Sequence, residues 1–239
     1  MNILLIGAPN AGKGTVGEVL VEELNMVLVS TGALFREEMA KETELGKEAE
    51  TYIKNGVLVP NELTFRILVD RIERDDCRRQ GFILDGFPRS MEQVEFLEKY
   101  LSESETNIDK VIYIEVEEKT IYERVSGRRL CRDCGAVYNI NSKPSAKGNR
   151  CEKCDGELYQ RKDETPEVVA RRIESFKNDT YPIISHFDNK GLVYRIDGNQ
   201  SLDYTLEQVF EVLGKKRGHN RWYIWRVNKK LLFWERLVE

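Results

Sequence analysis

The sequence predicts an α/β fold in which a parallel sheet is covered by helices on both faces. Short apolar runs alternate with longer segments in which apolar residues recur at helical spacing. The runs are nearly continuously apolar, which is typical of parallel strands that are buried on both faces. A glycine-rich segment, 7–15, directly follows the first run, as expected for a turn that leads from a strand into a helix.

Five apolar runs are predicted to form the strands of this sheet. They are residues 2–7, 26–30, 81–85, 110–116 and 191–197. Helices are expected between them, the first over 14–25. Thr165 and Pro166 are expected to begin a later helix as its N-cap and first-turn residues. Ser90-Met-Glu-Gln93 has the pattern of a capping box at the start of another.

Two stretches interrupt the alternation of strands and helices. Residues 31–60 contain two short helical patterns, and Gly56 is expected to end the second of them. Residues 128–163 contain four cysteines, many Gly, Asn and Ser residues, and little helical spacing. Both stretches are therefore predicted to be insertions into the core.

Length and composition indicate a soluble globular protein. The chain has 239 residues, enough for one α/β domain with insertions, with 41% hydrophobic and 33% charged residues. We find no apolar stretch of the roughly 18–20 residues that a membrane span requires. The first residues lack the pattern of a secretory signal. A cytoplasmic protein without a transmembrane segment is expected.

The C-terminal residues differ sharply from the rest of the chain. The net charge is −4, yet residues 215–239 carry eight cationic and only two acidic side chains, together with all three tryptophans. Such a shift predicts a separate module, 214–239, which is either a hairpin or a helix. We expect it to mediate self-association into a homo-oligomer, because exposed aromatic side chains favour burial between subunits. Packing on its own body, an anionic membrane surface or nucleic acid are the alternatives.

The segment Gly7-Ala-Pro-Asn10-Ala-Gly12-Lys13 has the spacing of a phosphate-binding loop. Backbone N–H groups of such a loop converge on phosphate oxygens, and the following helix adds positive potential. Lys13 can reach the β- and γ-phosphates. Gly14 stands where Ser or Thr is usual, and the hydroxyl is on Thr15. The loop alone indicates a nucleotide site but leaves the reaction open.

Four further segments specify that reaction. STGALFR (30–36), DGFPRSMEQ (85–93), ERVSGRR (123–129) and YQRKDE (159–164) follow the loop in order. With GAPNAGKGT (7–15), they resemble the adenylate kinase family from residue 1 to about residue 213. The resemblance implies the reaction ATP + AMP ⇌ 2 ADP with Mg²⁺. A kinase of the same fold with broader donors or another acceptor is the alternative.

The resemblance also implies the fold and its parts. It is the P-loop nucleoside monophosphate kinase fold, with a five-stranded parallel sheet flanked by helices. The core would comprise 1–29, 61–126 and 165–213. Two mobile parts would close over it, namely an AMP-binding part (30–60) and a zinc-binding lid (127–164).

Cationic side chains at motif positions suit phosphoryl transfer, which needs positioning and positive charge around the transferred group. They are Lys13, Arg89, Arg124, Arg128, Arg161 and Arg172. The family spacing favours Arg172 over the adjacent Arg171. Asp85 ends an apolar strand and is expected to hold a water on Mg²⁺. Asn10 replaces the glycine that is usual in this family's loop, and asparagine is the residue that best tolerates a positive φ after glycine. Ala33 stands where an aspartate is common.

The resemblance assigns two nucleotide sites. The ATP site would use Asn10, Ala11, Gly12, Lys13, Gly14, Thr15, Arg124, Arg128, Val137, Tyr138 and Gln200. The AMP site would use Thr31, Gly32, Arg36, Ile53, Val57, Leu58, Val59, Gly86, Arg89, Gln93, Arg161 and Arg172.

Four cysteines form two Cys-x-x-Cys pairs, Cys131 with Cys134 and Cys151 with Cys154. This spacing predicts a tetrahedral Zn²⁺ site with no open position, and therefore a structural metal on two knuckles that close a short hairpin. Two disulfides are an alternative. A zinc-ribbon nucleic-acid-binding protein with a nucleotide switch is a distant alternative, although no nucleic acid is expected. Cys77 is predicted to be a buried structural residue.

Overall fold

A five-stranded parallel sheet forms the centre of the computed structural model, which describes residues 1–161 and 163–216. Its strands are β1 (Ile3–Gly7), β2 (Val27–Ser30), β3 (Phe82–Asp85), β4 (Lys110–Glu115) and β8 (Val193–Asp197). Their order is β2-β3-β1-β4-β8, with Leu4 paired to Leu84 and Val111. All five strands fall on the predicted apolar runs. In such sheets, ligands bind outside the carboxyl ends of the strands, where the strand order reverses.

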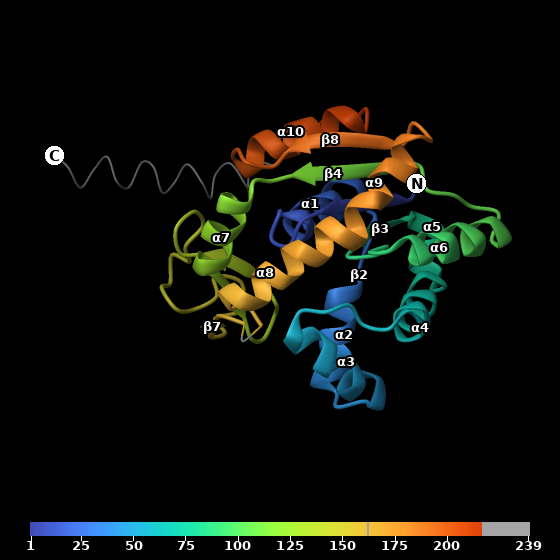
Figure 1. Cartoon of the computed structure of the whole chain (residues 1–239). Coiled ribbons are helices and arrows are strands. Elements are labelled where there is room, and N and C mark those ends of the chain that lie inside the picture. Colours follow the sequence, from blue (N-terminus) through green and yellow to red (C-terminus); the bar gives the residue numbers. More distant parts are fainter. Residues whose placement is uncertain (162, 217–239) are drawn as a thin grey trace.

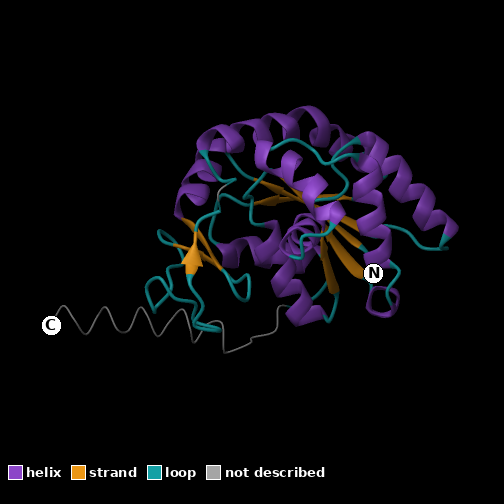
Figure 2. Cartoon of the chain, turned by 90° about the horizontal axis from the view of Figure 1, so that it is seen from below, coloured by secondary structure: helices purple, strands orange, loops and turns teal. Residues whose placement is uncertain are grey.

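Helices cover both faces of this sheet (Figures 1 and 2). The helices of the described residues are α1 (Lys13–Leu24), α2 (Thr31–Ala40), α3 (Glu44–Asn55), α4 (Asn61–Ile72), α5 (Asp75–Gln80), α6 (Met91–Glu103), α7 (Glu118–Gly127), α8 (Pro166–Ser175), α9 (Tyr181–Asp188) and α10 (Leu202–Val212). A one-turn π-helix, η1 (Phe176–Thr180), joins α8 directly to α9.

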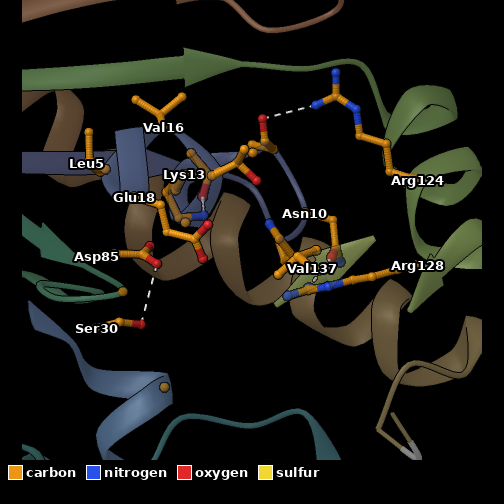
Figure 3. Close-up of a pocket in the computed structure, with 18 of the residues that line it drawn as sticks. Leu5, Asn10, Lys13, Val16, Glu18, Ser30, Asp85, Arg124, Arg128 and Val137 are labelled. Atoms are coloured by element: carbon orange, nitrogen blue, oxygen red, sulfur yellow. Dashed lines mark hydrogen bonds between the residues drawn. The ribbon is translucent and has the colours of Figure 1, made fainter. Parts of the chain in front are cut away.

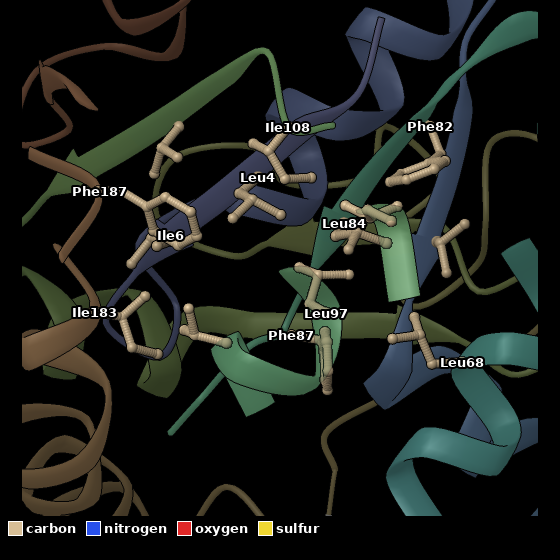
Figure 4. Close-up of a cluster of buried hydrophobic side chains, with 14 of the residues drawn as sticks. Leu4, Ile6, Leu68, Phe82, Leu84, Phe87, Leu97, Ile108, Ile183 and Phe187 are labelled. Atoms are coloured by element: carbon tan, nitrogen blue, oxygen red, sulfur yellow. The ribbon is translucent and has the colours of Figure 1, made fainter. Parts of the chain in front are cut away.

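The strands divide their side chains between two hydrophobic cores. Leu4 and Ile6 of β1 pack in one core with residues of α4, α6 and α9 (Figure 4). Ile3 and Leu5 pack in the other with residues of α1 and α10. Because successive side chains of a strand point to opposite faces, an unbroken apolar run supplies both cores at once.

The predicted helix boundaries are confirmed at Thr165 and Gly56. The hydroxyl of Thr165 accepts from the N–H of Val168 at 3.4 Å, and Gly56 ends α3 with φ 72°. The capping box at Ser90 is confirmed only in part. Its hydroxyl accepts from the N–H of Gln93 at 3.3 Å, but Gln93 Oε1 accepts from the N–H of Arg89 and not from that of Ser90.

The two helices of the first insertion, α2 and α3, project away from the sheet (Figure 1). They pack tightly at Gly46, where a Cβ would lie 2.3 Å from the backbone carbonyl of Glu38. No flexible side chain is involved, so one backbone would have to shift.

Gly46→Ala is therefore expected to destabilise the fold by about 2 kcal/mol, as overpacked sites do. Thermal unfolding monitored by circular dichroism should show a Tm lowered by about 4–8 °C. Thr51→Ala, an exposed position in the same helix, is the control and should leave the Tm nearly unchanged. An unchanged Tm for Gly46→Ala would mean that the two helices do not pack this closely.

The second insertion forms a small antiparallel sheet separate from the first (Figure 2). Its strands are β5 (Arg128–Cys131), β6 (Val137–Asn139) and β7 (Leu158–Tyr159), in the order β6-β5-β7. The sequence predicted only a hairpin. The third strand has two residues, too few to produce a recognisable apolar pattern.

Two expectations about the membrane and the C-terminus have different outcomes. Within the described residues, none of the helices has the length and apolarity needed to cross a bilayer. Of the predicted C-terminal module, only residues 214–216 are described, and the rest of 214–239 lies outside the described residues.

Candidate functional site

A cleft of about 2580 Å³ opens at the carboxyl ends of the strands of the large sheet. It is bordered by the glycine-rich loop, by the segment that contains α2 and α3, by the small sheet and by α8 (Figure 3). Sites for one small molecule usually measure roughly 300–1000 Å³, so this cleft has room for more than one. Every residue that the sequence predicted for the two nucleotide sites, and Asp85, lines it.

The glycine-rich loop places Lys13 at the bottom of this cleft. Gly12 has φ 105°, and α1 begins at the next residue. The ammonium group of Lys13 donates to the carbonyl oxygens of Gly7 at 2.8 Å and of Ala8 at 3.0 Å. Burial lowers the pKa of Lys13 to about 8. A cation in a loop whose backbone N–H groups precede a helix is suited to an anionic ligand.

Asn10 has φ 60°, a backbone conformation that asparagine tolerates better than any residue except glycine. Its side chain also has a partner of its own. The amide oxygen Oδ1 accepts a hydrogen bond from Arg128 Nη1 at 2.7 Å (Figure 3). Arg128 begins β5, so this contact joins the phosphate loop to the small sheet.

Glu164 is a partner of Arg128 that the sequence did not reveal. Its side chain is only 1% exposed, and Oε1 lies 3.1 Å from Arg128 Nη1. Burial is the main cause that lowers the pKa of Arg128, and Glu164 opposes it. Two acidic residues follow Arg161 in YQRKDE, and an acid so close to a motif arginine is a signal that could have indicated a partner.

Arg124 approaches the loop from α7. It donates to the carbonyl oxygen of Ala11 at 3.0 Å (Figure 3) and to that of Gly198 at 2.5 Å. The guanidinium thereby holds the phosphate loop against the segment that follows β8, where Gln200 also lines the cleft.

The end of β3 supplies a second group of cleft residues. Asp85 Oδ2 lies 3.4 Å from the hydroxyl of Ser30, and 3.9 Å from where a Cβ on Gly14 would stand (Figure 3). Gly86 has φ 83°, and its carbonyl accepts from Thr31 Oγ1 at 2.9 Å and from Arg89 Nε at 2.8 Å. Carboxylate and hydroxyl oxygens beside a phosphate loop are ligands that suit Mg²⁺ or its bound water.

Arg89 is held in the cleft from two sides. Its Nε donates to Gly86, and its own carbonyl accepts from the hydroxyl of Thr180 at 3.0 Å. Burial lowers the pKa of Arg89. Burial also lowers the pKa of Arg36, another cleft residue, to about 10, and the nearby Arg161 and Arg128 act in the same direction. Several buried cations in one cleft indicate an anionic ligand.

The side-chain amide of Gln93, which also lines the cleft, makes two hydrogen bonds. Its Nε2 donates to Asn61 Oδ1 at 2.8 Å, while its Oε1 accepts from the N–H of Arg89. The amide therefore connects α6 to α4. Because both of its ends are engaged in this way, it does not accept a hydrogen bond from the N–H of Ser90 as a capping box would.

Asp163 bridges two of the predicted arginines, a second contact that the sequence did not reveal. It is hydrogen-bonded to Arg161 and lies 2.5 Å from Arg172 Nη2. Arg172 also donates to the carbonyl of Ile53 at 3.3 Å. Arg171 instead contacts the carbonyl of Asn55 at 2.8 Å and does not line the cleft. The structure therefore places Arg172, which the family spacing favoured over Arg171, in the cleft.

Asp163→Asn is expected to reduce the free energy of unfolding at pH 7 by about 2 kcal/mol, because it leaves two arginines without their shared anion. Although burial opposes it, pairing with Arg161 and Arg172 holds the pKa of Asp163 well below its ordinary range. A lowered pKa stabilises the fold above the ordinary value of about 4, and this contribution is lost as the pH falls below it.

Urea unfolding at pH 7 and at pH 3.5 measures this contribution. The difference between the wild type and Asp163→Asn should be largest at pH 7 and smaller at pH 3.5. Effects of acid on the cysteines are common to both proteins and cancel. Asp70→Asn, which breaks an exposed pair with Arg74, is the control and should have little effect. A difference that does not depend on pH would contradict the assignment.

The four predicted cysteines lie together in the small sheet. Their sulfur atoms all lie within 4.8 Å of one another, with Cys131 and Cys154 at 3.4 Å and Cys134 and Cys151 at 3.6 Å. In a tetrahedral site with Zn–S distances of about 2.3 Å, neighbouring sulfurs lie about 3.8 Å apart. All five cysteines of the chain are free thiols, so the disulfide alternative is not supported. The donor set fits Zn²⁺.

The two Cys-x-x-Cys segments have the same backbone form. The N–H of Gly135 donates to the carbonyl of Cys131, and the N–H of Asp155 donates to that of Cys151. Gly135 and Asp155 both have positive φ, 69° and 65°. Tyr138 points into this cluster, because its hydroxyl lies 3.4 Å from Cys151 Sγ. Its ring is buried there, so this predicted ATP-site residue borders the cleft from within the small sheet.

Comparison with known proteins identifies the family. The sequence model of the adenylate kinase family matches residues 5–192. The adenylate kinase of Caldanaerobacter subterraneus subsp. tengcongensis is 42% identical over 218 residues, covering 91% of this chain and 98% of its own. That of Caldicellulosiruptor bescii is 44% identical over 214 residues, covering 90% and 99%, and that of Clostridioides difficile is 41% identical over the same coverage. With the parallel sheet, the phosphate loop and the arginines already in one cleft, these matches show that the chain is an enzyme and belongs to the adenylate kinase family.

Proposed function

We propose that this chain transfers the γ-phosphoryl group of ATP to AMP and reverses the reaction with two molecules of ADP. An oxygen of the AMP phosphate attacks the γ-phosphorus of ATP, and the bond from that phosphorus to the bridging oxygen of ADP breaks. One observation carries the proposal. A single cleft is lined by the phosphate loop at one end, by Thr31 and Gln93 at the other, and by arginines between them.

The donor would lie on the phosphate loop. The backbone N–H groups of residues 10–15 would hold the β-phosphate, and Lys13 would exchange its loop carbonyls for phosphate oxygens. Arg128 would reach the γ-phosphate from β5. The base would lie between Arg124, Val137, Tyr138 and the segment near Gln200, all of which border the cleft.

The acceptor would lie against α2, α3 and the end of β3. Thr31, Gly32, Ile53, Gln93 and the backbone of 57–59 would enclose the base and ribose of AMP. Arg36 and Arg89 would bind its phosphate. Arg161 and Arg172 would then bind the oxygens that carry charge during the transfer, and arginine suits this because it donates bidentately and stays protonated.

Two metals are proposed. Mg²⁺ bound with ATP would neutralise phosphate charge, and Thr15 together with a water on Asp85 would hold it. Zn²⁺ on Cys131, Cys134, Cys151 and Cys154 would stabilise the small sheet, which buries few apolar residues of its own. Thiol ligands require reducing conditions, which supports a cytoplasmic location.

A coupled assay of ADP formation tests the reaction. AMP, GMP, UMP and CMP are offered as acceptors with ATP, and then ATP, GTP and UTP as donors with AMP. We expect AMP to be the preferred acceptor. Higher kcat/KM with another monophosphate would reassign the acceptor within the same fold. Absence of turnover by the zinc-loaded protein would refute the proposed function and return attention to a nucleic-acid-binding zinc ribbon.

We also propose that residues 214–239 mediate self-association, on the strength of their cationic and aromatic composition. A chain that ends at Gly214 should scatter light as a smaller particle than the full chain. An unchanged mass per particle would refute self-association through these residues.

A further inference from the structure

The hydrogen bonds of Arg128 are distributed unevenly over its guanidinium group. Asn10 Oδ1 at 2.7 Å and Glu164 Oε1 at 3.1 Å both bind Nη1. Nε, on the opposite edge, is buried and has no hydrogen-bond partner among the described residues. The Nε–Nη2 edge is one that can donate two parallel hydrogen bonds to a phosphate. The protein thus binds one side of this arginine and leaves the buried Nε on the other side without a partner among the described residues.

Asn10 and Glu164 come from different parts of the chain. Asn10 lies in the phosphate loop, whereas Glu164 lies between the small sheet and α8. Arg128 itself begins β5. Its Nη1 therefore joins β5 to the phosphate loop through Asn10 and to the segment before α8 through Glu164. Glu164 Oε2 is also buried and has no partner among the described residues. The only side-chain hydrogen bond of this carboxylate within the described residues is therefore the one from Arg128 Nη1 to Oε1. The arrangement fixes the orientation of the guanidinium.

We propose that Asn10 is a positioning residue, which acts through Arg128 by fixing Nη1 so that the Nε–Nη2 edge faces the phosphates of the donor. The inference rests on the proposed contact between Arg128 and the donor. The backbone of Asn10, at φ 60°, would be satisfied by glycine. Its side chain is therefore not required for the loop conformation, and the hydrogen bond to Arg128 is what it adds.

The chemistry predicts which kinetic constants depend on Asn10. Arg128 would contact phosphate and not base, so the loss of Asn10 should weaken every triphosphate donor by the same factor. AMP would be held by other side chains, and its KM should stay constant. Because Asn10 bonds to a charged group, its loss is expected to lower kcat/KM for the donor roughly tenfold or more.

The experiment is a double-mutant cycle with Asn10→Gly and Arg128→Lys. Lysine keeps a charge for Glu164 but has no Nε–Nη2 edge to orient. We expect Asn10→Gly to lower kcat/KM about tenfold for both ATP and GTP, with KM for AMP within about twofold of the wild type. In the Arg128→Lys background, the same substitution should cost less than about threefold.

Asn25→Gly is the matched control. Asn25 also has a positive φ, 53°, but it ends α1 at an exposed position outside the cleft. It should keep the wild-type kinetics, and all variants should keep their zinc content and Tm within a few degrees.

Three results would overturn the inference. Asn10→Gly could leave kcat/KM within about twofold of the wild type, or it could cost the same factor in both backgrounds. In either case only the inference fails. Wild-type kinetics in Arg128→Lys would refute the proposed role of Arg128 as well, whereas the proposed reaction fails only if the wild type itself forms no ADP.

Discussion

Lys13→Met is expected to lower kcat by about 10³-fold or more while leaving the fold intact. The substitution removes the one cation that lies inside the phosphate loop, and phosphoryl transfer depends on such charges for positioning and stabilisation. Met has a similar length and no charge to desolvate. Since burial lowers the pKa of Lys13, its charge is unfavourable in the empty loop, and the Tm should stay equal or rise. The coupled assay and thermal unfolding measure the two effects.

The pH dependence of ATP binding provides the control for this prediction. Burial lowers the pKa of Lys13 to about 8, and the proposed contact with the phosphates of ATP requires its protonated form. Above pH 8, binding must therefore be accompanied by proton uptake, and the Kd of the wild type should rise by up to about tenfold per pH unit. Lys13→Arg keeps its charge at every pH and should lack this rise. Equal pH dependence in both proteins would show that another group titrates.

Cys154→Ala is expected to abolish stoichiometric zinc binding and to lower the Tm of the small sheet by more than 10 °C. Its sulfur lies 3.4 Å from that of Cys131, and a structural zinc supplies folding free energy that a few buried side chains cannot replace. Turnover at low temperature should decrease much less, because the cluster contributes no group to the transfer. Metal analysis, calorimetry and the assay at 15–20 °C give the three readouts.

Cys77→Ala is the matched control for the zinc prediction. Cys77 is buried in the core that contains Leu4 and Ile6, away from the cysteine cluster, and its sulfur accepts a hydrogen bond from Arg71. Its replacement should leave one zinc per chain and cost only the stability of a small cavity. A Cys154→Ala protein that keeps its Tm but loses turnover would contradict a structural role for the metal.

The sequence predicted the sheet and the cleft well because both depend on local signals. A parallel strand needs only an apolar run, so 110–116 and 191–197 were recognisable without knowledge of their neighbours. Motifs such as Asp85–Arg89 fix several cleft residues at once, because they lie on one short turn.

The contacts that the sequence did not predict depend on the folded arrangement. Glu164 is 36 positions away from Arg128 in the sequence, and Asn10 is 118 positions away from it, yet both are hydrogen-bonded to its guanidinium. No spacing rule relates such segments, and each acid or amide taken alone is more often solvated. Gln93 followed a local rule only in part, because Asn61 on another helix binds its side chain. These polar contacts required the tertiary structure.

The π-helix between α8 and α9 determines how the side chains of one helix are rotated about the helix axis relative to those of the other. A π-turn contains about one residue more than an α-turn, and one residue corresponds to about 100° of rotation around a helix. With the extra residue, Arg172 of α8 faces the cleft while Ile183 and Phe187 of α9 face the main core. A regular α-helix through 176–180 would rotate either Arg172 away from the cleft or Ile183 and Phe187 away from the core. A local change in helical winding therefore lets one continuous helical segment present a cleft residue at one end and core residues at the other.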